Sequence, residues 1–172
     1  MILEQILFYI AATISLVSTI LAVTRYNATH ALIYLIISLL ASAIIFFLLG
    51  APFAAILEVV IYAGAIMVLF VFVVMMLNLG APGVSQEREW LRPNMWIFPT
   101  ILTLVLFFEM VFVLSSSAIS LPGEAIGPKA VGLKLFGPYV LAVEIASMLL
   151  LAGLVGAYHL GRRYLDEGRG TR

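Results

Sequence analysis

The 172-residue sequence contains no cysteine, which excludes disulfides, thiolate metal sites and cysteine-held iron–sulfur clusters within the chain. Charge is scarce as well: charged residues make up 10% of the chain, and nine basic side chains cancel nine acidic ones. A neutral chain gives no reason to expect a nucleic acid as a partner. Hydrophobic residues reach 64%, with a mean hydropathy of +1.18. This composition is typical of an all-α integral membrane protein.

The sequence also lacks the common signatures of catalysis. It has no phosphate-binding loop, dinucleotide fingerprint or nucleophile–base pair. His30 and His159 are the only histidines, and both fall at ends of predicted spans, so we interpret them as interfacial side chains and not as haem ligands. We therefore expect no catalytic residue, no metal site and no cofactor in this chain.

Five hydrophobic stretches are each long enough to cross the roughly 30 Å core of a bilayer as a helix. They cover roughly residues 2–23, 29–49, 53–79, 95–117 and 138–160. The first begins with an acidic residue where a signal peptide carries positive charge, so we expect it to be retained as a span. The sequence thus predicts a single membrane domain over residues 1–172, with five transmembrane helices.

Two connections carry clear signals. Gly50-Ala51-Pro52 predicts a tight reversal, which makes the second and third spans antiparallel neighbours. The segment from Leu121 to Pro138 is rich in glycine and proline, and we expect it to be irregular and at the surface.

The basic residues predict the orientation of the chain in the membrane. Arg25, Arg88, Arg92 and the four arginines of the C-terminal tail fall on one side, whereas Lys129 and Lys134 fall on the other. Because arginine-rich connections stay in the cytoplasm, the N-terminus should lie outside and the C-terminus in the cytoplasm.

Three acidic residues fall inside spans: Glu58, Glu109 and Glu144. A charged carboxylate near the bilayer centre costs on the order of 2.5–3.5 kcal/mol, so each of them needs a reason. For Glu109 and Glu144, as secondary intramembrane acids, we favour hydrogen bonds that fix helix packing over a role in proton transfer. Ser147 and Tyr139 are the expected local partners of Glu144.

The third span carries the most distinctive pattern. Glu58 precedes Tyr62 by four residues, so both side chains project from one helix face. They can form a proton relay or a pair of interhelical hydrogen-bond partners, and the sequence leaves both readings open. Gly64, between two alanines, allows close helix approach and costs about 1 kcal/mol of helix propensity.

The first span carries Ala11, Ser15 and Thr19 at four-residue spacing. This stripe of small residues suits helix packing in lipid, and a hydroxyl path for protons is the alternative that we favour less.

Three stretches carry a family likeness: 58–78 (EVVIYAGAIMVLFVFVVMMLN), 135–144 (LFGPYVLAVE) and 30–35 (HALIYL). Together they resemble the J-subunit family of bacterial respiratory complex I, the proton-pumping NADH:quinone oxidoreductase. The sixth mitochondrially encoded membrane subunit is the counterpart of that family. The likeness covers nearly the whole chain and is weakest at residues 121–130 and in the tail.

The resemblance implies a non-redox core subunit of complex I in the cell inner membrane, beside subunits of the K, A, H and N types. FMN, iron–sulfur clusters, NADH and quinone then belong to other subunits. It also implies a gating π-bulge in the third span, over Tyr62, Ala63, Gly64, Ala65, Ile66, Met67 and Val68. The alternatives are a purely structural assembly subunit and, less favoured, an independent channel or transporter.

Overall fold

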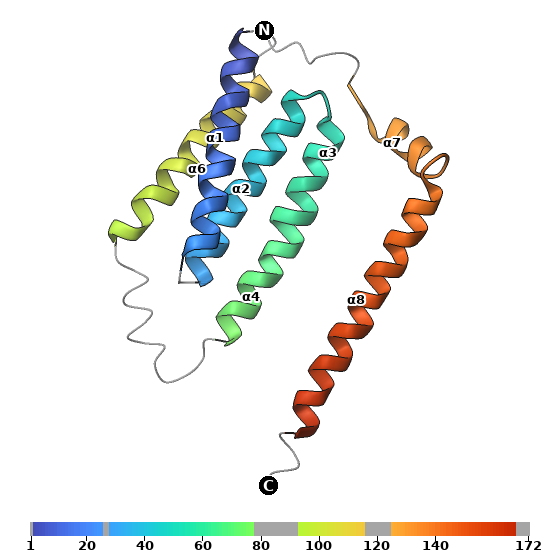
Figure 1. Ribbon diagram of the computed structural model, residues 1–172. Helices are drawn as coiled ribbons and strands as arrows, with labels where there is room; N and C mark the ends of the chain where they lie inside the picture. Colours follow the sequence, from blue (N-terminus) through green and yellow to red (C-terminus); the bar gives the residue numbers. More distant parts are fainter. Residues whose placement is uncertain (1, 26–27, 78–92, 116–124, 168–172) are drawn as a thin grey trace. The chain divides into compact units, whose positions relative to one another are not determined.

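The computed structural model describes residues 2–25, 28–77, 93–115 and 125–167, and every regular element in these ranges is a helix (Figure 1). Five stretches have the length and hydropathy to cross a membrane, which confirms the all-α class and the five predicted spans. They are Ile2–Thr24, Ala28–Leu48, Pro52–Met76, Trp96–Ser115 and Val140–Gly161. Predicted ends at 78–79 and 116–117 lie outside the described residues.

The chain divides into two compact units. Met1–Ile126 contains α1 (Ile2–Thr24), α2 (Ala28–Leu48), α3 (Pro52–Leu57), the π-helix η1 (Glu58–Ile66), α4 (Met67–Leu77) and α6 (Pro93–Ser115). Gly127–Arg172 contains α7 (Pro128–Leu135) and α8 (Val140–Glu167). One membrane domain over the whole chain stays a prediction. Residues 78–92 and 168–172, which hold several of the arginines used to predict orientation, lie outside the described part.

The core of the first unit is a seam between α1, α2 and α6. Its buried apolar residues recur every three or four positions, the spacing by which helices pack along one face. Its fully or nearly buried members are Leu7, Ala11, Ile14, Tyr34, Ile37, Ala41, Ile44, Leu48, Leu106 and Val113. The alanines Ala11 and Ala41 have no exposed surface, so they let the backbones approach closely, which is how helices associate in lipid.

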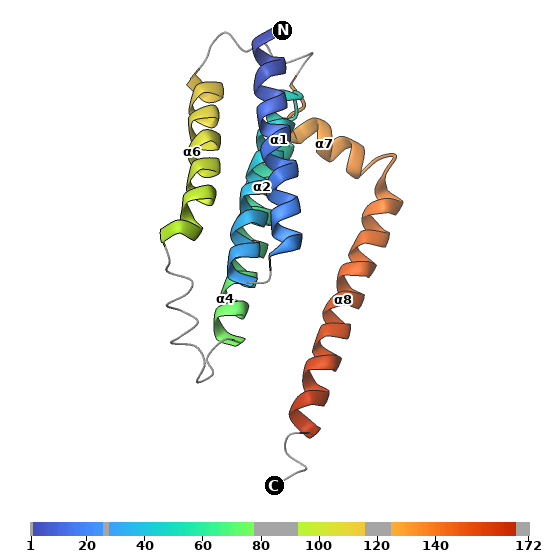
Figure 2. The same cartoon turned by 60° about the vertical axis from the view of Figure 1, so that its left-hand side comes forward.

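Hydroxyl groups fix α1 against α2. The Ser38 Oγ lies 2.7 Å from the Thr19 Oγ1 and 3.3 Å from the Ser15 Oγ, and the Ser15 Oγ lies 3.4 Å from the Ser42 Oγ. The small-residue stripe of the first span therefore lies in a helix interface. Since earlier α1 residues meet later α2 residues, the two helices are antiparallel (Figure 1, Figure 2).

Aromatic contacts set the register between α2 and α6. The rings of His30 and Trp96 lie 5.9 Å apart, and those of Tyr34 and Phe98 lie 6.4 Å apart. Both pairs advance in the same direction, so α2 and α6 run parallel. A residue on α6 is therefore level with the α2 residue about 64 to 66 positions earlier, because both helices rise by about 1.5 Å per residue.

The reversal after α2 forms as predicted. Gly50 has a positive φ of 82°, its N–H donates to the Phe47 carbonyl, and the Ala51 N–H donates to the Phe46 carbonyl. This is the pattern of a Schellman motif, which closes α2 with a glycine in the left-handed conformation. Pro52 then opens α3, where its fixed φ suits the first helical turn. As predicted, α2 therefore packs beside the third span.

The expectation of irregular structure from Leu121 to Pro138 is wrong in part. Pro128–Leu135 forms the eight-residue helix α7. Gly127 in extended conformation and Pro128 at the first helical position begin this helix, a common start signal. Residues 121–124 of the segment lie outside the described ranges.

Candidate functional site

The third span changes its hydrogen-bond register within the membrane-length stretch. At the end of α3 the Glu58 N–H donates to the carbonyls of Ala54 and Ala55. The Met67 N–H donates to the carbonyls of Gly64 and of Tyr62, which lies five residues earlier. Between these points lies η1, a π-helix of nine residues. π-helices are rare, mostly occur as single turns and are frequent at functional sites. This segment is therefore the candidate site.

The π-helix is longer and begins earlier than the predicted bulge. Residues Tyr62 to Ile66 belong to both, but Met67 and Val68 lie in α4, and the structure adds the turn that starts at Glu58. The π-helix therefore includes the predicted relay acid. Propensity alone does not reveal this, because the residues before Gly64 are ordinary helix formers in lipid.

Glu58 and Tyr62 share the π-helix without bonding each other. Glu58 is partly buried, the Tyr62 side chain is 50% exposed, and no hydrogen bond joins them among the described contacts. Ala63 is buried and Met67 is 7% exposed, so this side of the span packs into the first unit. The arrangement leaves the carboxyl and the phenol at the edge of the packed face.

Gly64 occupies a crowded backbone position. A Cβ added at Gly64 would lie 3.1 Å from the carbonyl oxygen of Val59, the residue five positions earlier. In a π-helix the carbonyl five residues earlier is the hydrogen-bond acceptor, so this contact is a feature of the π-helical form. A side chain at position 64 would therefore require the Val59 carbonyl oxygen to move by a few tenths of an ångström.

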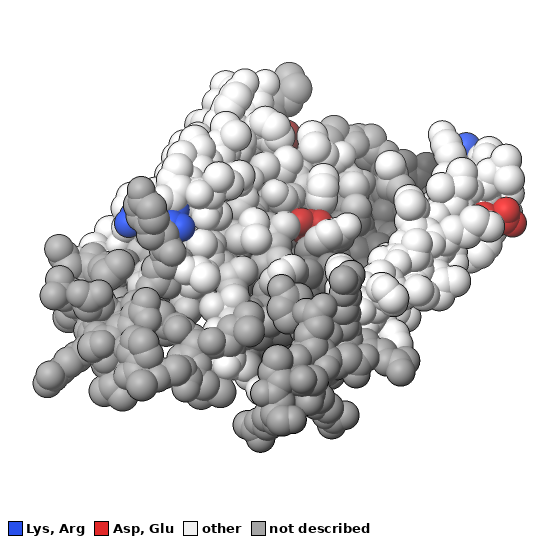
Figure 3. Space-filling model, turned by 60° about the horizontal axis from the view of Figure 1, so that its bottom comes forward, with Lys and Arg blue, Asp and Glu red and all other residues white. Residues whose placement is uncertain are grey.

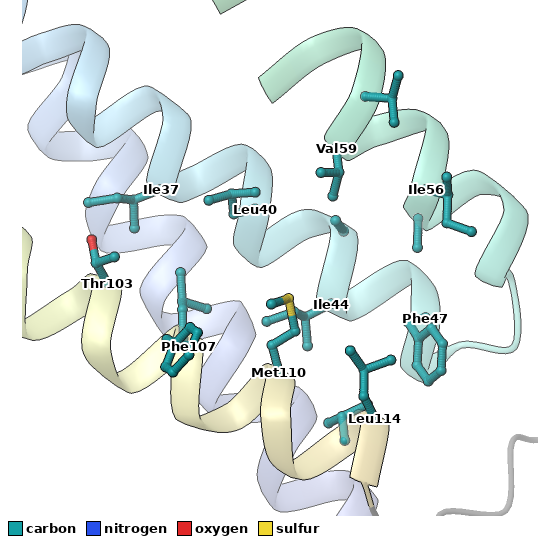
Figure 4. A pocket seen from close by; sticks show the side chains of 15 residues that line it. Ile37, Leu40, Ile44, Phe47, Ile56, Val59, Thr103, Phe107, Met110 and Leu114 are labelled. Carbon is teal, nitrogen blue, oxygen red and sulfur yellow. The ribbon is translucent and has the colours of Figure 1, made fainter. Parts of the chain in front are cut away.

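A groove of about 450 Å³ lies between α2, the α3–η1 segment and α6 (Figure 4). We call it the α2–η1–α6 groove. Its walls are Ile37, Leu40, Ala43, Ile44, Phe47, Ala55, Ile56, Val59, Val60, Thr103, Leu106, Phe107, Met110, Val113 and Leu114. The hydroxyl of Thr103 is the single polar group among these side chains. The groove is apolar, and neither Glu58 nor Glu109 lines it, although Val59 and Met110, their neighbours in sequence, do.

Glu109 lies in the packed interior of the first unit. Its side chain is only 6% exposed, and neither carboxyl oxygen has a hydrogen-bond partner among the described residues. The interhelical hydrogen bond that we expected for this acid is absent there. The sequence does contain a signal for this burial: Leu102, Leu106, Glu109 and Val113 follow one another at spacings of four, three and four residues, so they share one helix face.

The remaining candidate side chains are described each within its own unit. Glu144 on α8 is exposed within the second unit, and no hydrogen bond to Tyr139 or Ser147 is described. His30 is buried against the Trp96 ring, whereas His159 is exposed on α8. Among the residues placed by the structure, no group of three or more His, Cys, Asp or Glu side chains could hold a metal ion.

The described surface fits an apolar surrounding. On the face drawn in Figure 3, the described acidic and basic side chains are few, and most of the described surface is uncharged. Most exposed side chains of the spans are large and hydrophobic, among them Leu16, Phe70, Phe108 and Leu150. A chain with such a surface fits a bilayer and apolar partner helices.

Comparisons with known proteins agree on one family. Residues 18–160 match the model of the family NADH-ubiquinone/plastoquinone oxidoreductase chain 6. The chain is 57% identical over 158 residues to the NADH-quinone oxidoreductase subunit J of Pseudomonas aeruginosa, covering 91% of this chain and 95% of the relative. It is 57% identical over 156 residues to the subunit J of Escherichia coli K12, covering 90% and 85%. A subunit J from Buchnera aphidicola of Baizongia pistaciae is 36% identical over 160 residues, covering 92% and 98%.

Proposed function

The chain belongs to the NADH-ubiquinone/plastoquinone oxidoreductase chain 6 family, and on this premise we propose that it gates proton movement within the membrane arm of complex I. It is a multi-pass membrane subunit of an NADH-quinone oxidoreductase. It takes part in coupling electron transfer from NADH to quinone with proton translocation. The nine-residue π-helix of the third span is the observation that carries this proposal.

A π-helix can act as a switch because it differs from an α-helix by one hydrogen-bond position. Conversion to the α register shifts the chain by one residue, which turns everything beyond the shift by about 100° around the helix axis. Each side chain then takes roughly the place of its neighbour in sequence. The crowding at Gly64 makes the choice of register sensitive to small changes nearby.

The rotation of η1 would change which side chains line the α2–η1–α6 groove. Val59 and Val60 form part of its apolar wall, and Glu58 is the residue next to Val59. If the turn that contains Glu58 moves by one residue toward the position of Val59, the Glu58 carboxyl takes the place that the Val59 side chain now occupies. A carboxyl group in the wall attracts water, whereas the present walls favour a dry groove. Glu58 and Tyr62 then act as the relay, and the observed state is the closed one.

We propose further that the N-terminus lies outside and the C-terminus in the cytoplasm, as the basic residues predict. The partners are other membrane subunits of the complex, of the K, A, H and N types, and bilayer lipid. The subunit itself contributes no redox centre. Its apolar exposed faces suit such neighbours, because helices in membranes associate through packing of small and apolar side chains.

Two substitutions test the relay in the assembled complex in membrane vesicles. We expect Glu58→Gln and Tyr62→Phe to retain assembly and NADH oxidation but to lower the number of protons moved per NADH, since each removes a group that exchanges protons. Tyr9→Phe on α1, where the phenol is 67% exposed, is the matched control and should leave the proton yield unchanged. Equal proton yields in all three variants would support a purely structural subunit instead.

A further inference from the structure

We propose that Glu109 is a second proton-binding site, a neutral carboxyl group sealed in the α1–α2–α6 seam behind the wall of the α2–η1–α6 groove. The placement of the side chain gives the first argument. Leu106 and Val113, three residues before and four residues after Glu109, both belong to the packed core with α1 and α2. Glu109 shares their face of α6 and is 6% exposed. It therefore points into the seam and away from lipid.

The helix register identifies what surrounds the carboxyl. Phe98 is level with Tyr34, so Glu109, eleven residues later, is level with Ile45 and close to Ile44. Ser15 meets both Ser38 and Ser42, and counting back along the antiparallel α1 brings Ala11 to the same level. Ala11 has no exposed surface. The short alanine side chain leaves room in this layer for the longer acid.

Among the residues that the structure describes, no other titratable group on the helices packed against α6 compensates a charge at Glu109. On the two helices packed against α6, the described titratable side chains are Glu4, Tyr9, His30 and Tyr34. Tyr9 is 67% exposed and points away from the seam, and by register the other three lie roughly two or more helical turns from the level of Glu109. With both carboxyl oxygens unpartnered, the ionised form has neither a counter-charge nor a hydrogen-bond donor in the described structure. The carboxyl therefore binds a proton.

A single layer of side chains separates this proton from the groove. Leu106, Val113 and Ile44 belong both to the seam around Glu109 and to the groove wall, and Figure 4 labels Ile44 among the wall residues. The opposite wall is formed by Val59 and Val60 of η1. Movement of these shared residues admits water to the carboxyl. One O–H bond of Glu109 then breaks as its proton passes to a water oxygen, and a second proton from water restores the neutral acid.

This inference rests on the proposed function only for the event that opens the wall, which is the change of register in η1. Infrared spectroscopy of the assembled complex tests the site itself. We expect a band of a protonated carboxyl group that Glu109→Gln removes and that shifts slowly in D₂O. Leu106→Ala, which opens the shared wall, should make that shift on the order of tenfold faster. Leu104→Ala, also on α6 but 48% exposed and outside the groove wall, is the matched control and should leave the rate unchanged.

The outcomes separate this site from the relay in η1. Absence of the band, its persistence in Glu109→Gln, or equal exchange in Leu106→Ala and Leu104→Ala would overturn the proposal. If Glu109→Gln fails to assemble, the rates of the D₂O shift in the two leucine variants still test the proposal. We also expect Glu109→Gln to lower the proton yield per NADH while electron transfer continues, and an unchanged yield would reduce Glu109 to a packing residue. A lowered proton yield in Glu109→Gln, together with normal yields in Glu58→Gln and Tyr62→Phe, would contradict the proposed relay and support the Glu109 site.

Discussion

At the scale of residues, the unusual positions are small or acidic side chains placed where large apolar ones are expected. Ala11 and Ala41 let three helices meet, a Cβ at Gly64 would crowd the Val59 carbonyl oxygen, and Glu109 holds an acid in an apolar layer. Each of these side chains is smaller or more polar than its large apolar neighbours, at a position where the helices pack closely. A membrane protein keeps such costly groups mainly where they serve packing or transfer.

Gly64→Ala should bias the third span against its π register. The new methyl group would lie 3.1 Å from the Val59 carbonyl oxygen, which would have to move by a few tenths of an ångström, and a cost of about 1 kcal/mol shifts a two-state equilibrium about fivefold. We expect normal assembly and NADH oxidation with a reduced proton yield in vesicles.

Gly132→Ala in α7, where an added Cβ meets nothing within 4 Å, serves as the control for this substitution. If the two alanine variants pump equally well, the crowding at Gly64 has no bearing on coupling.

At the scale of elements, sequence reasoning found the spans because each depends on a long local run of apolar residues. The reversal at Gly50 was equally local, since one glycine and one proline specify it. The helix α7 was missed because a glycine- and proline-rich segment also contains good start signals for a short helix.

The candidate site was only half accessible to sequence reasoning. Glu58, Tyr62 and Gly64 stood out by residue type, but no local signal marks Glu58 as the first residue of the π-helix, which packs against α2. The groove could not be predicted, because its walls come from three segments far apart in the chain. For Glu109, the sequence placed an acid in a span, and only the register of three helices shows that it lacks a partner.

At the scale of the whole molecule, orientation decides which side of the membrane the acids approach. The absence of native cysteine makes this testable with single introduced thiols. We expect Ala130→Cys, beside Lys129 on α7, to react with a membrane-impermeant maleimide in intact cells. Thr24→Cys, at the end of α1, should react only after the membrane is permeabilised.

The reversed labelling pattern would invert the orientation and place Glu58 and Glu109 in the inner half of the membrane. Both positions are exposed in the described structure, so neither substitution disturbs the packed seam. The cysteine-free parent chain is the control for labelling of this subunit.

The gating role of the third span is tested most directly by the hydrogen-bond register of residues 58–66 in the whole complex, resolved by electron cryo-microscopy at rest and during turnover. We predict two registers: the π form seen here, with an apolar groove, and an α form in which water reaches Glu58. One unchanged register in both conditions, with no water along the Glu58 side of the helix, would contradict the proposed gate.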